Sequence, residues 1–133
     1  MPHRHAVVWI DYHEARIFKF DAEDVEKKRI KADTPSHQIH TKAGTIGAGH
    51  EHDSKQYFHS VVEAIADMDE WLVVGPAAAK TELVKHIETH DPRMRERLIG
   101  VEPMDHPTDG ELLKHARRFF DAADKLRGTK ALP

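Results

Sequence analysis

Several histidines of this chain lie close enough in sequence to suggest a metal site. The chain of 133 residues has 12 histidines and no cysteine, and one stretch contains His37, His40, His50 and His52. Imidazoles at these separations could reach one zinc-like ion if the stretch folded back on itself. Their spacing matches neither a helical H-E-x-x-H motif nor a cysteine-containing finger, and other histidines are spread along the chain. We therefore expect no physiological metal and no cofactor, with His50 and His52 as the nearest candidates for ligands.

Two carboxylates raise the question of a two-metal nuclease. Such a site needs several carboxylates around two ions about 4 Å apart. Asp11 follows an apolar run, and Glu63 lies in a segment with helical periodicity. The apolar run at residues 71–74 ends in Gly-Pro and supplies no further acid. Aspartate is also common in turns, where its side chain bonds its own backbone. We therefore expect a turn at Asp11, a solvent-facing Glu63 and no catalytic residue.

A glycine-rich segment is the clearest candidate for a contact with phosphate. Its glycines are Gly44, Gly47 and Gly49, with Lys42 before them and His50 after them. Glycines let backbone amides approach a phosphate closely. Their order, G-x-x-G-x-G, is not that of the dinucleotide-binding fingerprint. What the sequence predicts is a mobile loop that begins with a lysine.

Charge limits how the chain could bind nucleic acid. A net charge of -3 argues against affinity driven by bulk charge, so any RNA contact must be local. One local feature is a strand-like run at residues 25–32, in which Lys27, Arg29 and Lys31 share a face. These side chains could form a basic strip for phosphate, although protection of a sheet edge is the reading we favour. The absence of cysteine, of a membrane-length apolar run and of a secretory-type start predicts a cytoplasmic protein without membrane contact.

The order of elements predicts the fold. Strands are expected at His5–Ile10, at Glu14–Phe20 and at residues 25–32, 71–74 and 99–104. Helices are expected from Asp53, from Pro76 and from Thr108, where Thr108-x-x-Glu111 and the weaker Asp53-x-x-Gln56 resemble capping boxes. Residues 33–52 are expected to form a long loop, which is rare in a compact domain without a use for it. A three-strand meander followed by two crossovers outlines a ribonuclease H-like α/β fold over residues 1–133, taken as a single domain.

This outline fixes further expectations. Right-handed crossovers place the last two strands parallel to the first, which gives a five-stranded mixed sheet of order 3-2-1-4-5 with helices on both faces. The helices' apolar stripes predict a set of buried side chains. These are Phe58, Val62, Ile65, Leu83, Ile87, Leu112, Phe119 and Phe120.

Short runs along the chain resemble a known family. They are Val-Val-Trp-Ile-Asp at residues 7–11, Glu-Ala-Arg-Ile-Phe at 14–18, Tyr-Phe-His-Ser-Val-Val at 57–62 and Leu-Val-Val-Gly-Pro at 72–76. Together with the glycine-rich segment, they resemble the middle domain of archaeal and eukaryotic class-1 release factors and Pelota. The similarity extends to small bacterial relatives labelled translational machinery or host-attachment proteins. The resemblance implies a role linked to the ribosome.

One departure from the family bears on chemistry. Release factors carry Gly-Gly-Gln in the corresponding loop, which promotes hydrolysis of peptidyl-tRNA. Here the chain reads Gly-Ala-Gly-His at residues 47–50, and Gln38 and Gln56 flank no glycine pair. We therefore expect a non-hydrolytic accessory protein that contacts the ribosome or structured RNA through Lys42 and the segment up to His50. Peptidyl-tRNA hydrolysis and a protein-interaction module are the alternatives, and the sequence leaves the oligomeric state open.

Overall fold

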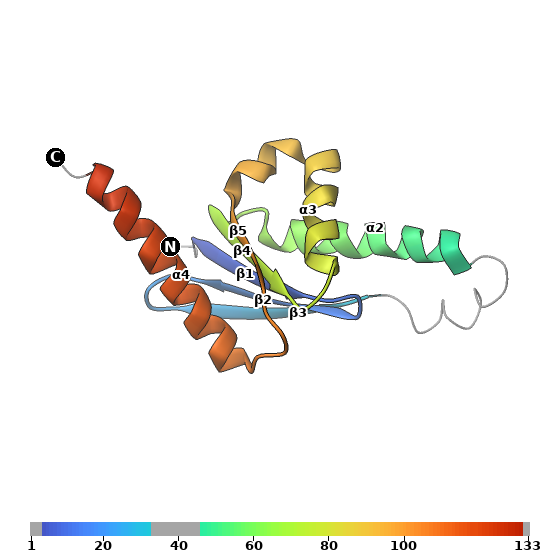
Figure 1. The fold of residues 1–133 in the computed structure, drawn as a ribbon, viewed down its shortest axis with the longest axis horizontal. Coiled ribbons are helices and arrows are strands. Elements are labelled where there is room, and N and C mark those ends of the chain that lie inside the picture. The colour runs from blue at the N-terminus through green and yellow to red at the C-terminus, as the bar shows by residue number, and fades with distance from the viewer. Residues whose placement is uncertain (1–3, 33–45, 132–133) are drawn as a thin grey trace.

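The computed structural model describes the backbone of residues 4–32 and 46–131 and the side chains of residues 4–32 and 55–126 (Figure 1). Three strands come first, and helices then alternate with two more strands. The elements are β1 (His5–Ile10), β2 (Glu14–Phe20), β3 (Val25–Lys31), α2 (Ile46–Ile65), β4 (Glu70–Gly75), α3 (Ala79–His90), the 3-10 helix η1 (Pro92–Arg97), β5 (Leu98–Pro103) and α4 (Asp109–Ala131).

The five strands form one mixed sheet of order β3-β2-β1-β4-β5. The β1–β2 and β2–β3 pairs are antiparallel, whereas β1–β4 and β4–β5 are parallel. A tight turn can join antiparallel neighbours, but parallel neighbours need a crossover, and the helices α2 and α3 supply it here. The predicted α/β class and strand order are therefore confirmed, with β1 at the centre and β3 at one edge.

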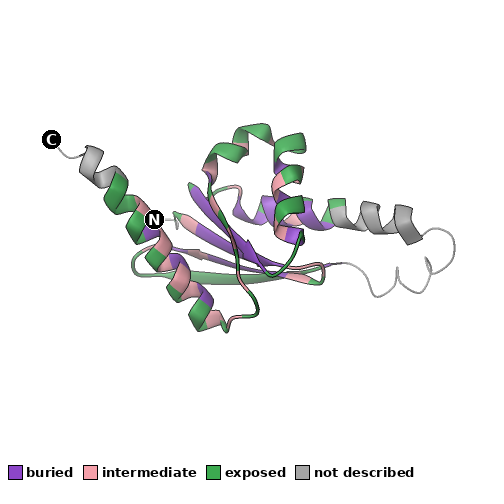
Figure 2. Ribbon diagram, viewed as in Figure 1, coloured by how far each residue is buried: buried purple, intermediate pink, exposed green. Residues whose placement is uncertain are grey.

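Helices cover both faces of the sheet (Figure 2). On one face, Ala6, Val8 and Ile10 of β1 join a core completed by α2 and α3. On the other, Val7 and Trp9 join a core completed by α4. A strand buried on both faces needs apolar residues at every position, which is why β1 lacks the alternation of a half-exposed strand.

The predicted core is largely correct. Seven of the eight expected side chains are buried, with exposed fractions of 4% or less, and the exception is Phe119. Its ring lies over Gly100 of edge strand β5, where an added Cβ would come within 2.7 Å of the Phe119 Cζ atom. Phe120 points to the middle of the sheet instead. The prediction that Phe119 is largely buried was wrong because its place near the sheet edge leaves it partly open to solvent.

Helix boundaries differ from the predicted ones at two places. Helix α2 begins at Ile46, not at Asp53, so residues 46–52 of the expected loop are helical. Once the apolar stripe of a helix packs on the sheet, each residue added at the end of that helix gains a backbone hydrogen bond and avoids the cost of helix nucleation. Helix α3 begins at Ala79, after the expected start at Pro76. The remainder of the expected loop, residues 33–45, lies outside the described residues.

The start of α4 agrees with the prediction. The Thr108 backbone N–H donates to Glu111 Oε1 at 2.8 Å, and the Glu111 N–H donates to Thr108 Oγ1 at 3.1 Å. This reciprocal pair is the capping box, which satisfies two amides that have no partner within the helix. Among the described residues, no helix has the length and hydropathy needed to cross a membrane.

Candidate nucleic-acid interface

The basic residues predicted on the third strand lie on an exposed sheet edge. Strand β3 forms one end of the strand order, and among the described strands it pairs with β2. Lys27, Arg29 and Lys31 are opposite Phe18, Arg16 and Glu14 of β2, and directly opposed residues share a face. They therefore lie together on the α4 side of the sheet, and all three are exposed.

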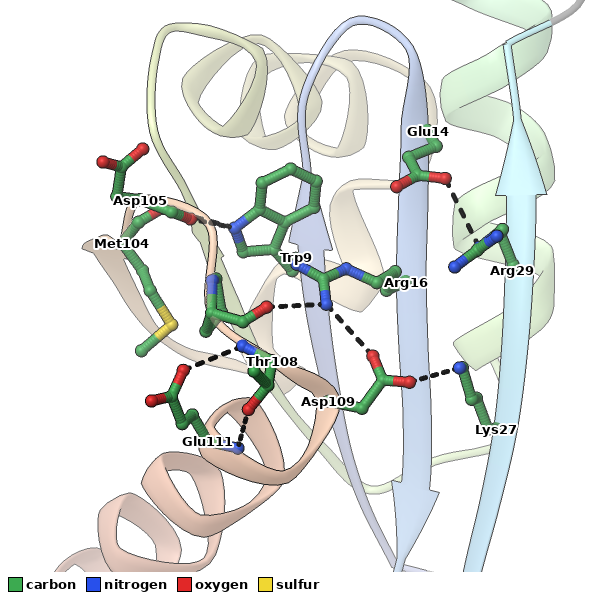
Figure 3. A network of polar contacts seen from close by, with 11 residues as sticks. Trp9, Glu14, Arg16, Lys27, Arg29, Met104, Asp105, Thr108, Asp109 and Glu111 are labelled. Carbon is green, nitrogen blue, oxygen red and sulfur yellow. Dashed lines mark hydrogen bonds and ion pairs between the residues drawn. The ribbon is translucent and has the colours of Figure 1, made fainter.

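Two of these three cations are held by carboxylates. Lys27 forms an ion pair with Asp109 at the start of α4, and Arg29 Nε lies 3.3 Å from Glu14 Oε1 (Figure 3). Lys31 forms no ion pair with a carboxylate in the described part of the chain, and neither does exposed Lys28 on the opposite face. Lys28 and Lys31 are therefore the cations of this edge most available to an external anion.

Arg16 is the centre of the polar network that connects β2 to α4. Its Nη1 donates to the Pro107 carbonyl at 2.9 Å and to Asp109 Oδ1 at 3.0 Å. Its guanidinium carbon lies 4.6 Å from the centroid of the Trp9 ring. Figure 3 shows the two side chains close together. The residue is only 8% exposed. Arginine suits this position because its planar, weakly hydrated group can stack on an aromatic ring and bond an acid at once.

Trp9 anchors the same network from β1. Its Nε1–H donates to the carbonyl of Asp105 at 2.6 Å and reaches that of Met104 at 3.3 Å. These bonds fix the segment that enters α4. The network therefore holds the start of α4 against the basic edge, and its contacts stabilise the position of this helix on the sheet.

The carboxyl group of Asp109 is stabilised in its charged form. The hydrogen bond from Lys27 and then that from Arg16 lower its pKa below the ordinary value of 3.8. The start of α4 adds favourable helix-dipole charge. A group with a depressed folded-state pKa contributes stability above its unfolded pKa, and that contribution is lost as pH falls through the folded pKa.

This linkage predicts the effect of Asp109→Asn. Near neutrality the variant should be less stable than the unchanged protein, because the amide cannot form the two ion pairs. The difference in unfolding free energy between the two proteins should narrow as pH falls below 3.8, because the Asp109 carboxylate of the unchanged protein then becomes protonated. Denaturant titrations of both proteins near neutrality and at about pH 3 measure this difference. A difference that is constant or grows in acid would contradict the role of the Asp109 charge.

Asp11 and Glu63 each have a local partner within their own element or turn. Asp11 Oδ1 accepts hydrogen bonds from the N–H groups of His13 at 2.7 Å and Glu14 at 2.9 Å, which closes the predicted turn. Glu63 is exposed and lies 3.3 Å from His59 of its own helix. Neither belongs to the one group of three potential metal ligands found among the described residues.

The glycine-rich segment is described only in part. Gly47, Gly49 and His50 fall within the helical bounds of α2. Lys42 and Gly44 lie outside the described residues, as do the side chains of His50 and His52. The predicted role of this segment and the expectation about loop metal ligands therefore stay predictions.

Arg16 is the residue that sequence reasoning missed. Its partners Pro107 and Asp109 are far away in sequence, so no local motif reveals them. One signal was present, because Arg16 shares a face with Phe18 and Phe20 in an alternating strand. An arginine in register with buried aromatic residues indicates a buried partner.

Comparisons with known proteins identify similar folds. No family model matches the chain, and neither does any curated protein. The archaeal translation termination factor aRF1 has 16% identity and a TM-score of 0.59, over 96% of this chain and 40% of that one. Pelota of Archaeoglobus fulgidus has 13% identity and a TM-score of 0.60, over 89% of this chain and 32% of Pelota.

A second Pelota, from Thermoplasma acidophilum, has 15% identity and a TM-score of 0.54, over 82% of this chain and 30% of that Pelota chain. This chain spans less than half the length of each of these three proteins. The structural neighbours agree with the resemblance found in the sequence. The chain has a fold found in parts of an archaeal release factor and of archaeal Pelota.

Proposed function

We propose that this chain is a translation-related accessory protein that contacts ribosomal or other structured RNA through the edge strand β3. In this proposal the chain does not hydrolyse peptidyl-tRNA. The observation that carries the proposal is local charge. Lys27, Lys28, Arg29 and Lys31 are all exposed on one edge strand of a chain whose net charge is -3. The neighbour aRF1 is a translation termination factor, and the proposal extends that association to this chain.

The two available lysines suit phosphate. Lys28 and Lys31 lie on opposite faces of β3, because residues at odd separations alternate across a strand. Two cations on either side of one edge can contact separate phosphates of a folded backbone, and phosphate contacts position a protein on RNA. Lys27 and Arg29 add little net positive charge, because each is paired with a carboxylate, so the proposed contacts rest on Lys28 and Lys31.

The glycine-rich segment extends this surface in the proposal. Lys42 and Gly44 lie between β3 and α2 in sequence, and Gly47, Gly49 and His50 fall within the first turns of α2. Lys42 and His50 would add contacts to phosphate. The stretch reads Gly-Ala-Gly-His where a hydrolysing loop of the resembling family has Gly-Gly-Gln, which supports binding without hydrolysis.

The test uses a double variant and a matched control. Lys28→Ala with Lys31→Ala should weaken association with ribosomes or structured RNA several-fold and reduce the salt-dependence slope by about 1–2, because two phosphate contacts disappear. The control is Lys85→Ala with Lys114→Ala, which removes the same charge from exposed positions of α3 and α4. Co-sedimentation and fluorescence anisotropy over a salt series measure both. Neither double variant should change stability by more than about 0.5 kcal/mol.

Other results would redirect the proposal. Equal weakening in both double variants would mean that general charge, not the β3 edge, drives association. Association that does not depend on salt would favour a protein partner. Release of peptide from peptidyl-tRNA above the uncatalysed rate would favour the hydrolase alternative. Lys42→Ala with His50→Ala tests the segment in the same assay.

A further inference from the structure

A second polar cluster lies where the later half of α4 crosses the beginnings of β1 and β4. It consists of His5, Glu70 and Asp124, whose potential ligand atoms all lie within 4.8 Å of one another. The parallel register places His5 directly beside Glu70, and His5 Nε2 lies 3.1 Å from Glu70 Oε1. This cluster is at the opposite end of β1 from Asp11, and it includes neither the loop histidines nor the basic edge.

The surroundings hold the imidazole in place. The His5 ring stacks on Phe120 with centroids 4.3 Å apart, and it contacts Phe20 at 5.8 Å. The side chains of His5 and Glu70 are only 13% and 11% exposed. Two groups fixed by packing form a preorganised pair, while exposed Asp124 approaches them from α4.

A pocket of 270 Å³ opens at the same place, between α4 and the turn that follows β2. Its lining includes His5 and Asp124, together with Asp21, Asp121 and Arg117. Arg117 is occupied at the turn, since its Nη1 donates to the Asp21 carbonyl at 2.8 Å. Among the described residues that line this pocket, acidic groups therefore outnumber basic ones, and this excess favours a cation over an anion.

We propose that His5, Glu70 and Asp124 bind one divalent transition-metal ion of the zinc type, with its fourth position open to the pocket. One imidazole nitrogen and two carboxylates match the donors that zinc accepts, whereas magnesium and calcium prefer all-oxygen sites of higher coordination number. Zinc holds such ligands at about 2.0–2.2 Å. The three groups must close slightly from their present separations to reach these distances.

Bound metal would connect α4 to the two central parallel strands. The ion would bind the folded chain far better than the unfolded one, since the three ligands are distant in sequence. Another histidine group, His59, His86 and His90 around a pocket between α2 and α3, is a weaker candidate. No three of its potential ligands lie within 4.8 Å of one another among the described residues.

The experiment compares zinc binding by the metal-free protein and two variants. Asp124→Asn removes one proposed ligand, and Asp121→Asn removes the same charge from the same helix and pocket without touching the three ligands. Titration calorimetry should give one tight site in the unchanged protein and in Asp121→Asn. Excess zinc should raise the Tm of both by about 5 °C or more. Asp124→Asn should lose at least tenfold in affinity and most of the Tm rise.

Cobalt provides a spectroscopic readout that does not depend on stability. Its visible absorption should report a site of mixed nitrogen and oxygen ligands in the unchanged protein and in Asp121→Asn, and the signal should be lost in Asp124→Asn and Glu70→Gln. Zinc that binds Asp124→Asn and Glu70→Gln as tightly as the unchanged protein would overturn the proposal. So would the absence of a stoichiometric site, or magnesium binding as tightly as zinc.

Discussion

Replacing Phe120 by alanine is expected to lower the free energy of unfolding by about 3–5 kcal/mol. Phe120 is 1% exposed. Its ring stacks on His5 and meets Phe20 edge-on with centroids 5.9 Å apart. The loss would combine the transfer free energy of a large ring with the cavity that remains, because in the described part of the chain α4 is the one helix that contributes to the core on this face of the sheet.

Denaturant unfolding at neutral pH measures the loss, with two comparisons on the same helix. Phe119→Ala should cost less, because that ring is partly open to solvent above Gly100. Leu126→Ala should stay within about 0.5 kcal/mol, because Leu126 is 73% exposed. If Phe119→Ala cost more than Phe120→Ala, α4 would be rotated from the orientation described, and the original expectation about Phe119 would be restored.

The strands and their order could be predicted because their causes are local or topological. Apolar runs and alternation marked β1 and β2, and the handedness of crossovers fixed where β4 and β5 lie. The turn at Asp11 and the capping box at Thr108 were equally visible, since each bond joins residues no more than three apart. Phe119 and Phe120 were harder, because both lie near one apolar stripe and only the packing against β5 separates them.

The start of α2 depended on causes that a short window does not contain. Glycine weakens a helix by about 1 kcal/mol relative to alanine, so Gly47 and Gly49 argued for a loop. Asp53 resembled a cap and placed the start later. Packing of the stripe around Phe58 and Val62 on the sheet outweighs that local preference. Tertiary contacts thus decided the boundary.

The polar clusters were the least predictable features. Arg16 of β2 meets Asp109 only after α4 packs on the sheet. His5 comes near Glu70 and Asp124 only after β1 and β4 pair and α4 crosses them. The basic strip on β3 was visible because its residues occupy alternate positions of one strand and therefore share a face. The ion pair of Lys27 could not be predicted from the sequence, since its partner Asp109 comes from a helix far along the chain. Sequence patterns therefore locate charges well and their partners poorly.

Arg16→Ala is the second variant with a large expected effect, a loss of about 2–4 kcal/mol in unfolding free energy. The change removes two hydrogen bonds of a charged donor, one to the Pro107 carbonyl and one to Asp109. It also removes the contact of the guanidinium with the Trp9 ring. In the variant, Asp109 keeps its ion pair with Lys27 and stays partly exposed. The loss should therefore be smaller than for a fully buried charge that is left without a partner.

Two comparisons separate the role of Arg16 from that of charge alone. Arg16→Lys keeps the positive charge but loses the planar group that stacks on Trp9 while bonding both oxygens, so it should recover only part of the stability. Arg95→Ala removes an exposed pair with Glu88 and a long hydrogen bond to the Leu98 carbonyl at 3.4 Å, and it should cost at most about 1 kcal/mol. Denaturant titration ranks the three variants. If Arg16→Lys matched the unchanged protein, the contribution of Arg16 would be that of a point charge, and the stacked geometry on Trp9 would add nothing to the attachment of α4.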